Sequence, residues 1–278
     1  MKIDKIIKFL QQEKIDFFIL PNSDEFANEY IPESEKRVQF ISNFSGSNAV
    51  IIFTKEGKNF FFTDGRYLNQ AEQELDLNFF EIIDLGEINW HIFLQKKCQK
   101  NEIIAFDPKL HSIFQIQQLE KFCSNIKPIK NPIDKIWQND ANNPKPVLIN
   151  SKIFPHKIQY AGVYWQNKIQ KIQNYLNKNQ AIILNCPTSI AWLFNIRASD
   201  IAYTPVPLGY AIILQNKVKL FFDKSSISTE TAKHLENIEI ISPNFFSNEI
   251  KKISNIEFKL DYSQCNYAIF NLLLKNKI

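Results

Sequence analysis

Residues 49–67 read AVIIFTKEGKNFFFTDGRY, and this stretch determines the fold of the first half of the chain. Its two apolar runs flank Glu56-Gly57-Lys58, a typical turn sequence, so it predicts a β-hairpin. A second hairpin is predicted at residues 211–223, AIILQNKVKLFFD, with its turn near Asn216-Lys217. Two antiparallel elements of the same kind indicate that the chain contains two related sheets.

The segments around both hairpins follow one order. In the first copy we expect a helix and then five strand segments, with a second helix before the last of them. The second copy repeats this order but ends at its second helix, without a last strand. The expected strands are 16–20, 49–63 (the hairpin), 79–84, 103–107 and 127–131, then 181–184, 211–223 (the hairpin), 238–242 and 256–261. Helical stretches such as WHIFLQKKCQ and FFSNEIKKI alternate with the outer strands, which favours parallel neighbours in a mixed sheet covered by helices. The second copy reaches Ile278 without a counterpart of the last strand, so we expect it to be truncated there.

A chain of 278 residues is long enough for two domains of ordinary size. The segment NPIDKIWQNDANNPKPVLIN (131–150) carries Pro132, Pro144 and Pro146, which disfavour a regular helix or a central strand there. We therefore expect this segment to join an α/β domain at residues 1–145 to a second one at residues 146–278.

Composition and charge exclude several classes of protein. The net charge of +4 comes without a basic stripe, which argues against nucleic-acid binding. No apolar run reaches the roughly 18 residues that span a bilayer, and the N-terminal stretch predicts a core-packed helix rather than a signal peptide. The four cysteines form no CxxC pair, so we expect free thiols in a reducing cytoplasm.

No catalytic motif is present. The four histidines are isolated from paired acids, which predicts packing or surface roles and no metal site in this chain. The sequence contains no GxSxG elbow, which argues against a serine hydrolase. It also contains no glycine-rich phosphate loop, which argues against a nucleotide cofactor.

Five ordered motifs nevertheless carry a family resemblance over essentially the whole chain. They are RVQFISNFSGSNAVIIF (37–53), FFTDGRYLNQAEQEL (61–75), NPIDKIW (131–137), IAWLFNIRASDI (190–201) and TPVPLGYAII (204–213). Together they resemble the two N-terminal domains of Xaa-Pro aminopeptidases, the aminopeptidase P family related to prolidase and creatinase. The resemblance implies two creatinase N-terminal-like domains. In the family a C-terminal pita-bread domain, which this sequence does not contain, holds two divalent metals, typically manganese, and cleaves the bond before a proline.

Arg66 is the candidate substrate-binding residue. Asp64-Gly65 forms a turn that presents Arg66 at the rim of the sheet, where a guanidinium suits a carboxylate or a peptide carbonyl. The second hairpin keeps the aspartate as Asp223 but lacks the arginine, so folding alone does not require Arg66. The resemblance implies that Arg66 reaches toward bound peptide. The alternative is a surface arginine paired with an acid such as Glu72 or Glu74.

The other motifs favour structural roles. Trp192, Leu193, Phe194 and Ile196 predict packing around a short helix. The pair Arg197 and Asp200 is expected to interact at the end of that helix. In place of the family's acidic pair before this helix and its glycine after the arginine, the chain has Thr188-Ser189 and Ala198, which counts against a contribution of the second domain to an active site.

Gly46, in the turn that enters the first hairpin, is expected to supply backbone freedom.

From these features we expect a cytoplasmic, non-catalytic N-terminal region that is inactive alone and contributes a substrate rim for Xaa-Pro peptides and a dimer surface. Whether the protein counts as an enzyme depends on a metal-binding domain. The alternatives are half of a split proline-specific aminopeptidase completed by a separate catalytic chain, and an independent interaction scaffold. The incomplete second repeat leaves a strand edge that favours a homodimer. No catalytic residue, metal ligand, nucleic-acid partner or membrane partner is expected in this chain.

Overall fold

The computed structural model describes residues 2–275, and these divide into two compact units. Among the described residues, unit 1 comprises 2–24 and 33–147, and unit 2 comprises 25–32 and 148–275. The chain therefore passes between the units three times. We retain the division into residues 1–145 and 146–278 as a proposal for the sequence repeat.

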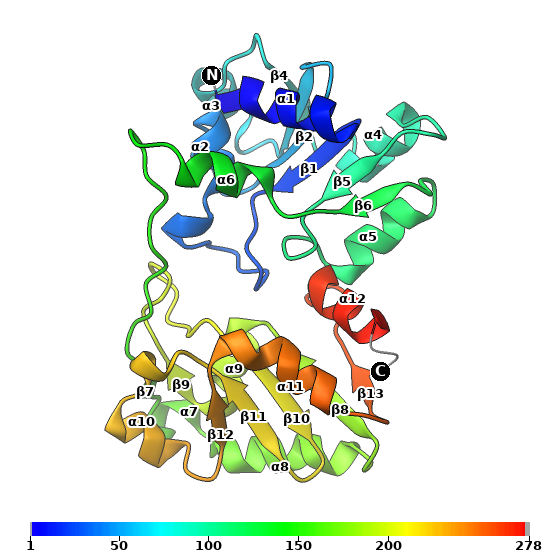
Figure 1. The fold of residues 1–278 in the computed structure, drawn as a ribbon. Helices are drawn as coiled ribbons and strands as arrows, with labels where there is room; N and C mark the ends of the chain where they lie inside the picture. Colours follow the sequence, from blue (N-terminus) through cyan, green and yellow to red (C-terminus); the bar gives the residue numbers. More distant parts are fainter. Residues whose placement is uncertain (1, 276–278) are drawn as a thin grey trace. The chain divides into compact units, whose positions relative to one another are not determined.

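Unit 1 contains a six-stranded mixed sheet in the order β4-β3-β2-β1-β5-β6 (Figure 1). Its strands are β1 (Phe17–Pro21), β2 (Val50–Thr54), β3 (Asn59–Thr63), β4 (Phe80–Asp84), β5 (Ile104–Phe106) and β6 (Ile126–Pro128). Its helices are α1 (Lys2–Glu13), α2 (Arg37–Ser42), α3 (Leu68–Glu74), α4 (Trp90–Lys97), α5 (Ile113–Glu120), α6 (Pro132–Gln138) and the 3₁₀ helix η1 (Glu33–Glu35).

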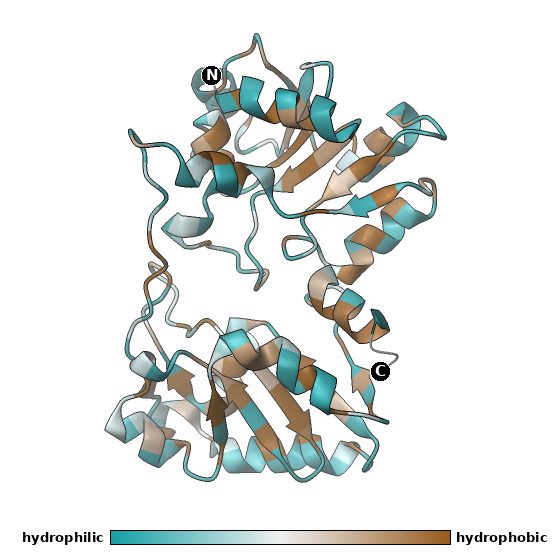
Figure 2. Cartoon of the chain, in the orientation of Figure 1, coloured by the Kyte–Doolittle hydropathy of each residue, from teal (hydrophilic) through white to brown (hydrophobic). Residues whose placement is uncertain are grey.

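Strand β1 lies inside this sheet, antiparallel to β2 and parallel to β5, and every residue of β1 is buried. Helix α1 places Ile3, Ile6 and Leu10 in the core below it. Hydrophilic and hydrophobic residues alternate along α1, as expected of a helix that covers one face of a sheet (Figure 2).

Unit 2 repeats the plan with a five-stranded sheet in the order β12-β11-β10-β8-β13. Its strands are β8 (Gln180–Leu184), β10 (Tyr210–Leu214), β11 (Val218–Phe221), β12 (Glu239–Ile241) and β13 (Glu257–Lys259), and β7 (Phe154–Pro155) and β9 (Ile196–Arg197) form a separate pair. Its helices are α7 (Ile158–Ala161), α8 (Trp165–Tyr175), α9 (Pro187–Phe194), α10 (Thr229–His234), α11 (Phe246–Lys252), α12 (Tyr267–Lys275) and the 3₁₀ helices η2 (Lys224–Ser226) and η3 (Pro243–Phe245).

The two hairpins and the mixed α/β sheets confirm the predicted fold class. The first five strands of unit 1 and the five strands of unit 2 have the same order and the same pattern of parallel and antiparallel pairs. Among residues 2–275 the second sheet has no counterpart of β6. The expected truncation at Ile278 falls on residues 276–278, which lie outside the described part of the chain.

The prediction of an irregular segment from residue 131 onward was wrong for its first part. Residues 132–138 form α6, because Pro132 occupies the first turn of the helix, where its missing N–H has no partner to lose. Asn131 precedes it and accepts a hydrogen bond from Ile133 N at 3.0 Å, so the helix begins with a side-chain cap. From residue 139 to residue 150 the segment is irregular, as predicted.

Candidate functional site

Arg66 lies in the turn between β3 and α3, and its side chain is 72% exposed. The turn is built by Asp64, which accepts a hydrogen bond from Arg66 N at 3.1 Å. The guanidinium then bonds the same carboxylate twice, from Nε to Oδ1 at 2.8 Å and from Nη2 to Oδ2 at 2.9 Å. A bidentate contact of this kind fixes the plane of the guanidinium while most of the side chain remains in solvent.

Neighbouring residues hold this arrangement in place. Asn48 donates from Nδ2 to Asp64 Oδ2 at 2.7 Å, and the Arg66 guanidinium carbon lies 5.2 Å from the centre of the Tyr67 ring. The Tyr67 hydroxyl contacts the Ser47 hydroxyl at 2.7 Å. The hydrogen bonds from Arg66 and Asn48 hold the pKa of Asp64 well below its usual range, so this carboxylate stays ionised and keeps orienting Arg66.

The acid observed beside Arg66 is Asp64, and the alternative pairing with Glu72 or Glu74 stays a prediction. Glu74 accepts hydrogen bonds from Ser45 N and Oγ and from Gln70, and Asp64, two residues before Arg66, forms an ion pair with it. In unit 2, Asp223 makes the same turn by accepting from Ser225 N at 2.8 Å. The turn therefore forms in both units, with an arginine in one and a serine in the other.

Gly46 is needed for close approach. A Cβ atom at this position would lie 2.3 Å from Phe44 Cζ and 2.8 Å from Tyr67 Cδ1. The expected backbone freedom is not what selects glycine, because Gly46 does not have a positive φ. By contrast, a Cβ atom at Gly65 would meet nothing within 4 Å.

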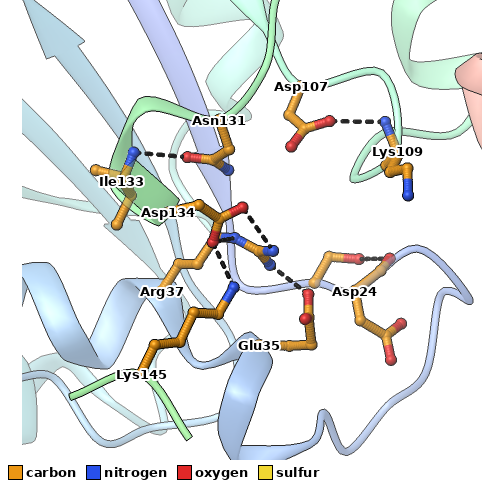
Figure 3. A network of polar contacts seen from close by, with 10 residues as sticks. Asp24, Glu35, Arg37, Asp107, Lys109, Asn131, Ile133, Asp134 and Lys145 are labelled. Atoms are coloured by element: carbon orange, nitrogen blue, oxygen red, sulfur yellow. Dashed lines mark hydrogen bonds and ion pairs between the residues drawn. The ribbon is translucent and has the colours of Figure 1, made fainter. Parts of the chain in front are cut away.

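A second charged group in unit 1 was not anticipated from the sequence (Figure 3). Arg37 is buried and donates from Nε and Nη2 to Asp134 at 2.9 and 3.1 Å, and from Nη1 to Glu35 at 2.5 Å. Lys145 adds a contact from Nζ to Asp134 at 2.6 Å. Burial acts to raise the pKa of Asp134, but the hydrogen bonds and charges of Arg37 and Lys145 lower it overall.

Asp107 and Asn131 lie beside this network, at the carboxyl ends of β5 and β6 (Figure 3). Both are buried, and burial raises the pKa of Asp107, although Lys109 N donates to its Oδ1 at 3.0 Å. The Asn131 Nδ2 atom has no hydrogen-bond partner among the described residues. The sequence signal was an arginine and two aspartates inside apolar surroundings, but their pairing spans 97 residues and cannot be read locally.

The predicted pair of Arg197 and Asp200 does not form. Arg197 donates from Nη1 to the carbonyls of Ala191 in α9 and Ile196 in β9, whereas Asp200 accepts from Ser151 and from Leu208 N. The guanidinium thus adds a hydrogen bond to a carbonyl in the last turn of α9, whose Ala191 O also accepts from Asn195 N.

The predicted packing around α9 is confirmed for Leu193, Phe194 and Ile196, which are buried, but Trp192 is 59% exposed. The Lys168 ammonium lies 4.1 Å from the centre of the Trp192 ring.

Among residues 2–275, no three His, Cys, Asp or Glu side chains converge to hold a metal ion. His111 is buried against Phe106 and Trp90, and burial lowers its pKa to about 4, whereas the His234 ring lies 2.9 Å from the Phe194 carbonyl. All four cysteines are free; Cys123 and Cys265 are buried, and Cys98 and Cys186 are half-buried.

No helix in the described part of the chain combines the length and apolar character needed to cross a membrane.

Comparison with known proteins identifies both halves of the chain. Residues 2–136 and residues 144–278 each match a model of the creatinase/prolidase N-terminal domain. A probable Xaa-Pro aminopeptidase P from Neosartorya fischeri is 32% identical over 254 residues, which are 87% of this chain and 38% of that protein. The corresponding protein of Aspergillus niger is 31% identical, over 87% of this chain and 40% of its own length. The chain thus spans about two fifths of these relatives.

The same fold is present in a solved structure. The X-prolyl aminopeptidase from Caenorhabditis elegans, described as a cytosolic enzyme with a di-nuclear active site, superposes with a TM-score of 0.87 at 24% identity. The match covers 98% of this chain and 48% of that enzyme, so it includes both units.

Proposed function

We propose that this chain, which belongs to the Xaa-Pro aminopeptidase family, is the non-catalytic N-terminal region of such an enzyme. It consists of two creatinase/prolidase N-terminal domains. In this role it supplies a rim that contacts a peptide with an N-terminal Xaa-Pro sequence. The hydrolytic centre lies in a metal-binding domain, either further along a longer chain or on a separate catalytic chain.

The main support for this proposal is the orientation and exposure of the Arg66 side chain. Its guanidinium is held in one plane by Asp64 yet remains 72% exposed, which is the condition of a side chain oriented for an external ligand. Asp223 and Ser225 form the same turn in unit 2 without an arginine, which supports a role for Arg66 outside folding.

The chemistry assigned to Arg66 is recognition. A guanidinium donates hydrogen bonds to a peptide carbonyl or carboxylate and does not activate water. Its contact is expected to position the peptide, so its loss should appear in the efficiency of cleavage.

A chimera tests both parts of the proposal. The present chain replaces the matching N-terminal part of the Aspergillus niger relative, and release of the N-terminal residue from an Xaa-Pro peptide is measured. We expect turnover by the chimera and, in Arg66→Ala, a kcat/KM lower by roughly 10- to 100-fold, the range for a lost hydrogen bond to a charged group. Arg66→Lys should fall in between, because an ammonium cannot reproduce the planar fork.

Lys58 provides the matched control. Its side chain is 71% exposed and pairs with Glu81 at 2.8 Å, so Lys58→Ala removes a cation of similar exposure from the same hairpin. This variant should cleave like the wild type. A folded chimera without turnover would contradict the assignment as an N-terminal region, whereas full turnover by Arg66→Ala would contradict only the role of Arg66.

The proposal also includes self-association and a cytoplasmic location. Large apolar side chains are exposed along one stretch of unit 2, which supports a protein contact there. They are Phe154, Ile158, Tyr160, Val163 and Tyr164. Light scattering at high concentration should give the mass of a dimer, and the double variant Tyr160→Asp, Tyr164→Asp should be monomeric. A monomeric wild type would refute the dimer.

The cytoplasmic location is supported by the description of the Caenorhabditis elegans enzyme as cytosolic.

A further inference from the structure

Unit 2 contains residues 25–32, a segment that lies in the sequence between β1 and α2 of unit 1. We call these residues the strap. Two buried side-chain amides of unit 2 converge on one carbonyl of the strap: Asn266 Nδ2 donates to Glu25 O at 2.8 Å, and Asn185 Nδ2 donates to it at 3.4 Å. These hydrogen bonds join residues 241 and 160 positions apart in the chain.

The next residue of the strap completes an aromatic cluster. Phe26 is 7% exposed, and its ring centre lies 5.2 Å from that of Tyr210 in β10. Tyr210 in turn stacks on Phe246 of α11 at 4.3 Å with an interplanar angle of 16°. The strap thus covers the start of β10, a strand inside the second sheet.

These contacts bury Phe26 of the strap in unit 2, whereas Ala27, Glu29 and Tyr30 are exposed. Without the strap, the ring of Tyr210 would lose one of its aromatic neighbours, and Asn266 Nδ2 would lose the carbonyl that accepts its hydrogen bond. An uncovered aromatic and an unsatisfied buried donor both raise the free energy of the folded state. Residues 148–278 therefore carry a surface that receives a turn, with a carbonyl at Glu25 and an aromatic ring at Phe26.

The chain that follows the strap is held in unit 1. The strap is followed directly by η1, where Glu35 binds Arg37, and Arg37 binds Asp134 (Figure 3). The residues that directly follow the strap are therefore fixed in unit 1.

We propose that residues 25–32 are a structural element of the second domain supplied by the chain of the first, so that the stability of the second domain depends on a segment outside its own sequence repeat. Phe26 and the Glu25 carbonyl are the recognised groups. Asn185, Asn266 and Tyr210 form the surface that receives them.

Hydrogen exchange of the full chain tests this proposal, with Phe26→Ala as the main variant and Tyr30→Ala as its control. Tyr30 lies in the same strap but is 53% exposed, so its truncation removes an aromatic ring without uncovering the core. Exchange is followed by mass spectrometry on peptides from β8 and β10 in unit 2 and from β1 and β5 in unit 1.

In Phe26→Ala the amides of β8 and β10 should exchange about 10- to 100-fold faster than in the wild type, since truncation of a buried aromatic lowers the free energy of local opening. The amides of β1 and β5 should be unchanged, and Tyr30→Ala should behave like the wild type. If Phe26→Ala folds poorly, Phe26→Leu, which keeps an apolar side chain, should show a smaller increase in the same peptides.

Faster exchange confined to β1 and β5 would show that the strap is only a loop of unit 1, and would overturn the proposal. An equal increase in the exchange rate of all four strands in Phe26→Ala would overturn it as well. So would equal increases in Phe26→Ala and Tyr30→Ala.

Discussion

Replacing Arg37 with methionine is expected to destabilise unit 1 far more than the same replacement at Lys36. The side chain of Arg37 is 8% exposed and binds two carboxylates, those of Asp134 and Glu35. Methionine fills a similar apolar volume but leaves both acids without their principal cation. Lys36 forms an ion pair with Glu33 at 2.5 Å, with side chains 35% and 70% exposed, so Lys36→Met is the matched surface control.

The size of the effect follows from the burial of the three groups. Breaking a buried ion pair by removing one partner costs about 3–5 kcal/mol. Here the carboxylates of Glu35 and Asp134 remain 23% and 27% exposed, and Lys145 still binds Asp134 at 2.6 Å. Partial hydration and this remaining cation place the loss at about 2–3 kcal/mol. In a unit of this size it corresponds to a decrease in melting temperature of about 8–12 °C.

The measurement is unfolding by heat and by urea at pH 7, followed by circular dichroism. Arg37→Met should lower the midpoint by this amount, whereas Lys36→Met should change stability by less than about 1 kcal/mol. Because Arg37 and Lys145 lower the folded-state pKa of Asp134, their stabilisation is present at neutral pH and is lost as the pH falls through that pKa. The difference between wild type and Arg37→Met should therefore shrink in acid.

Equal effects of the two substitutions would refute this reasoning, because they would show that the buried network contributes no more than a surface pair. A difference that stays constant from neutral pH to about pH 3 would refute its electrostatic origin.

Three further outcomes are expected. Burial raises the pKa of Asp107 in the folded protein, so this residue lowers the stability of the wild type as the pH rises from the ordinary pKa to the folded-state pKa. Asp107→Asn should therefore be more stable than the wild type in urea at pH 7 and equally stable near pH 3. Gly46→Ala should cost about 1–3 kcal/mol in thermal unfolding, whereas Gly65→Ala, with open space around it, should change stability little. The purified chain should neither bind Mn²⁺ in calorimetry nor release the first residue of an Xaa-Pro peptide; metal-dependent turnover that co-purifies with it would contradict this.

The hairpins and the order of the strands could be predicted from sequence because they depend on neighbours along the chain. The apolar runs 50–54 and 59–63 flank a short turn at Gly57, and their pairing closes a loop of only a few residues. The turn around Arg66 is local in the same sense, since Asp64 binds an N–H two residues away. These features recur in unit 2, where a similar pattern of residues meets the same local constraints.

The sequence alone therefore determined two α/β domains, the exposed turn that presents Arg66 and the family resemblance. Only the tertiary structure decided which charges and amides meet: Arg37 with Asp134 across 97 residues, and Asn266 with Glu25 across 241. Such pairs leave no periodic signal, because a buried cation or amide needs one partner of the right geometry, and that partner can come from any part of the chain. For the same reason, the assignment of residues 25–32 to unit 2 comes from the fold and not from their position in the sequence.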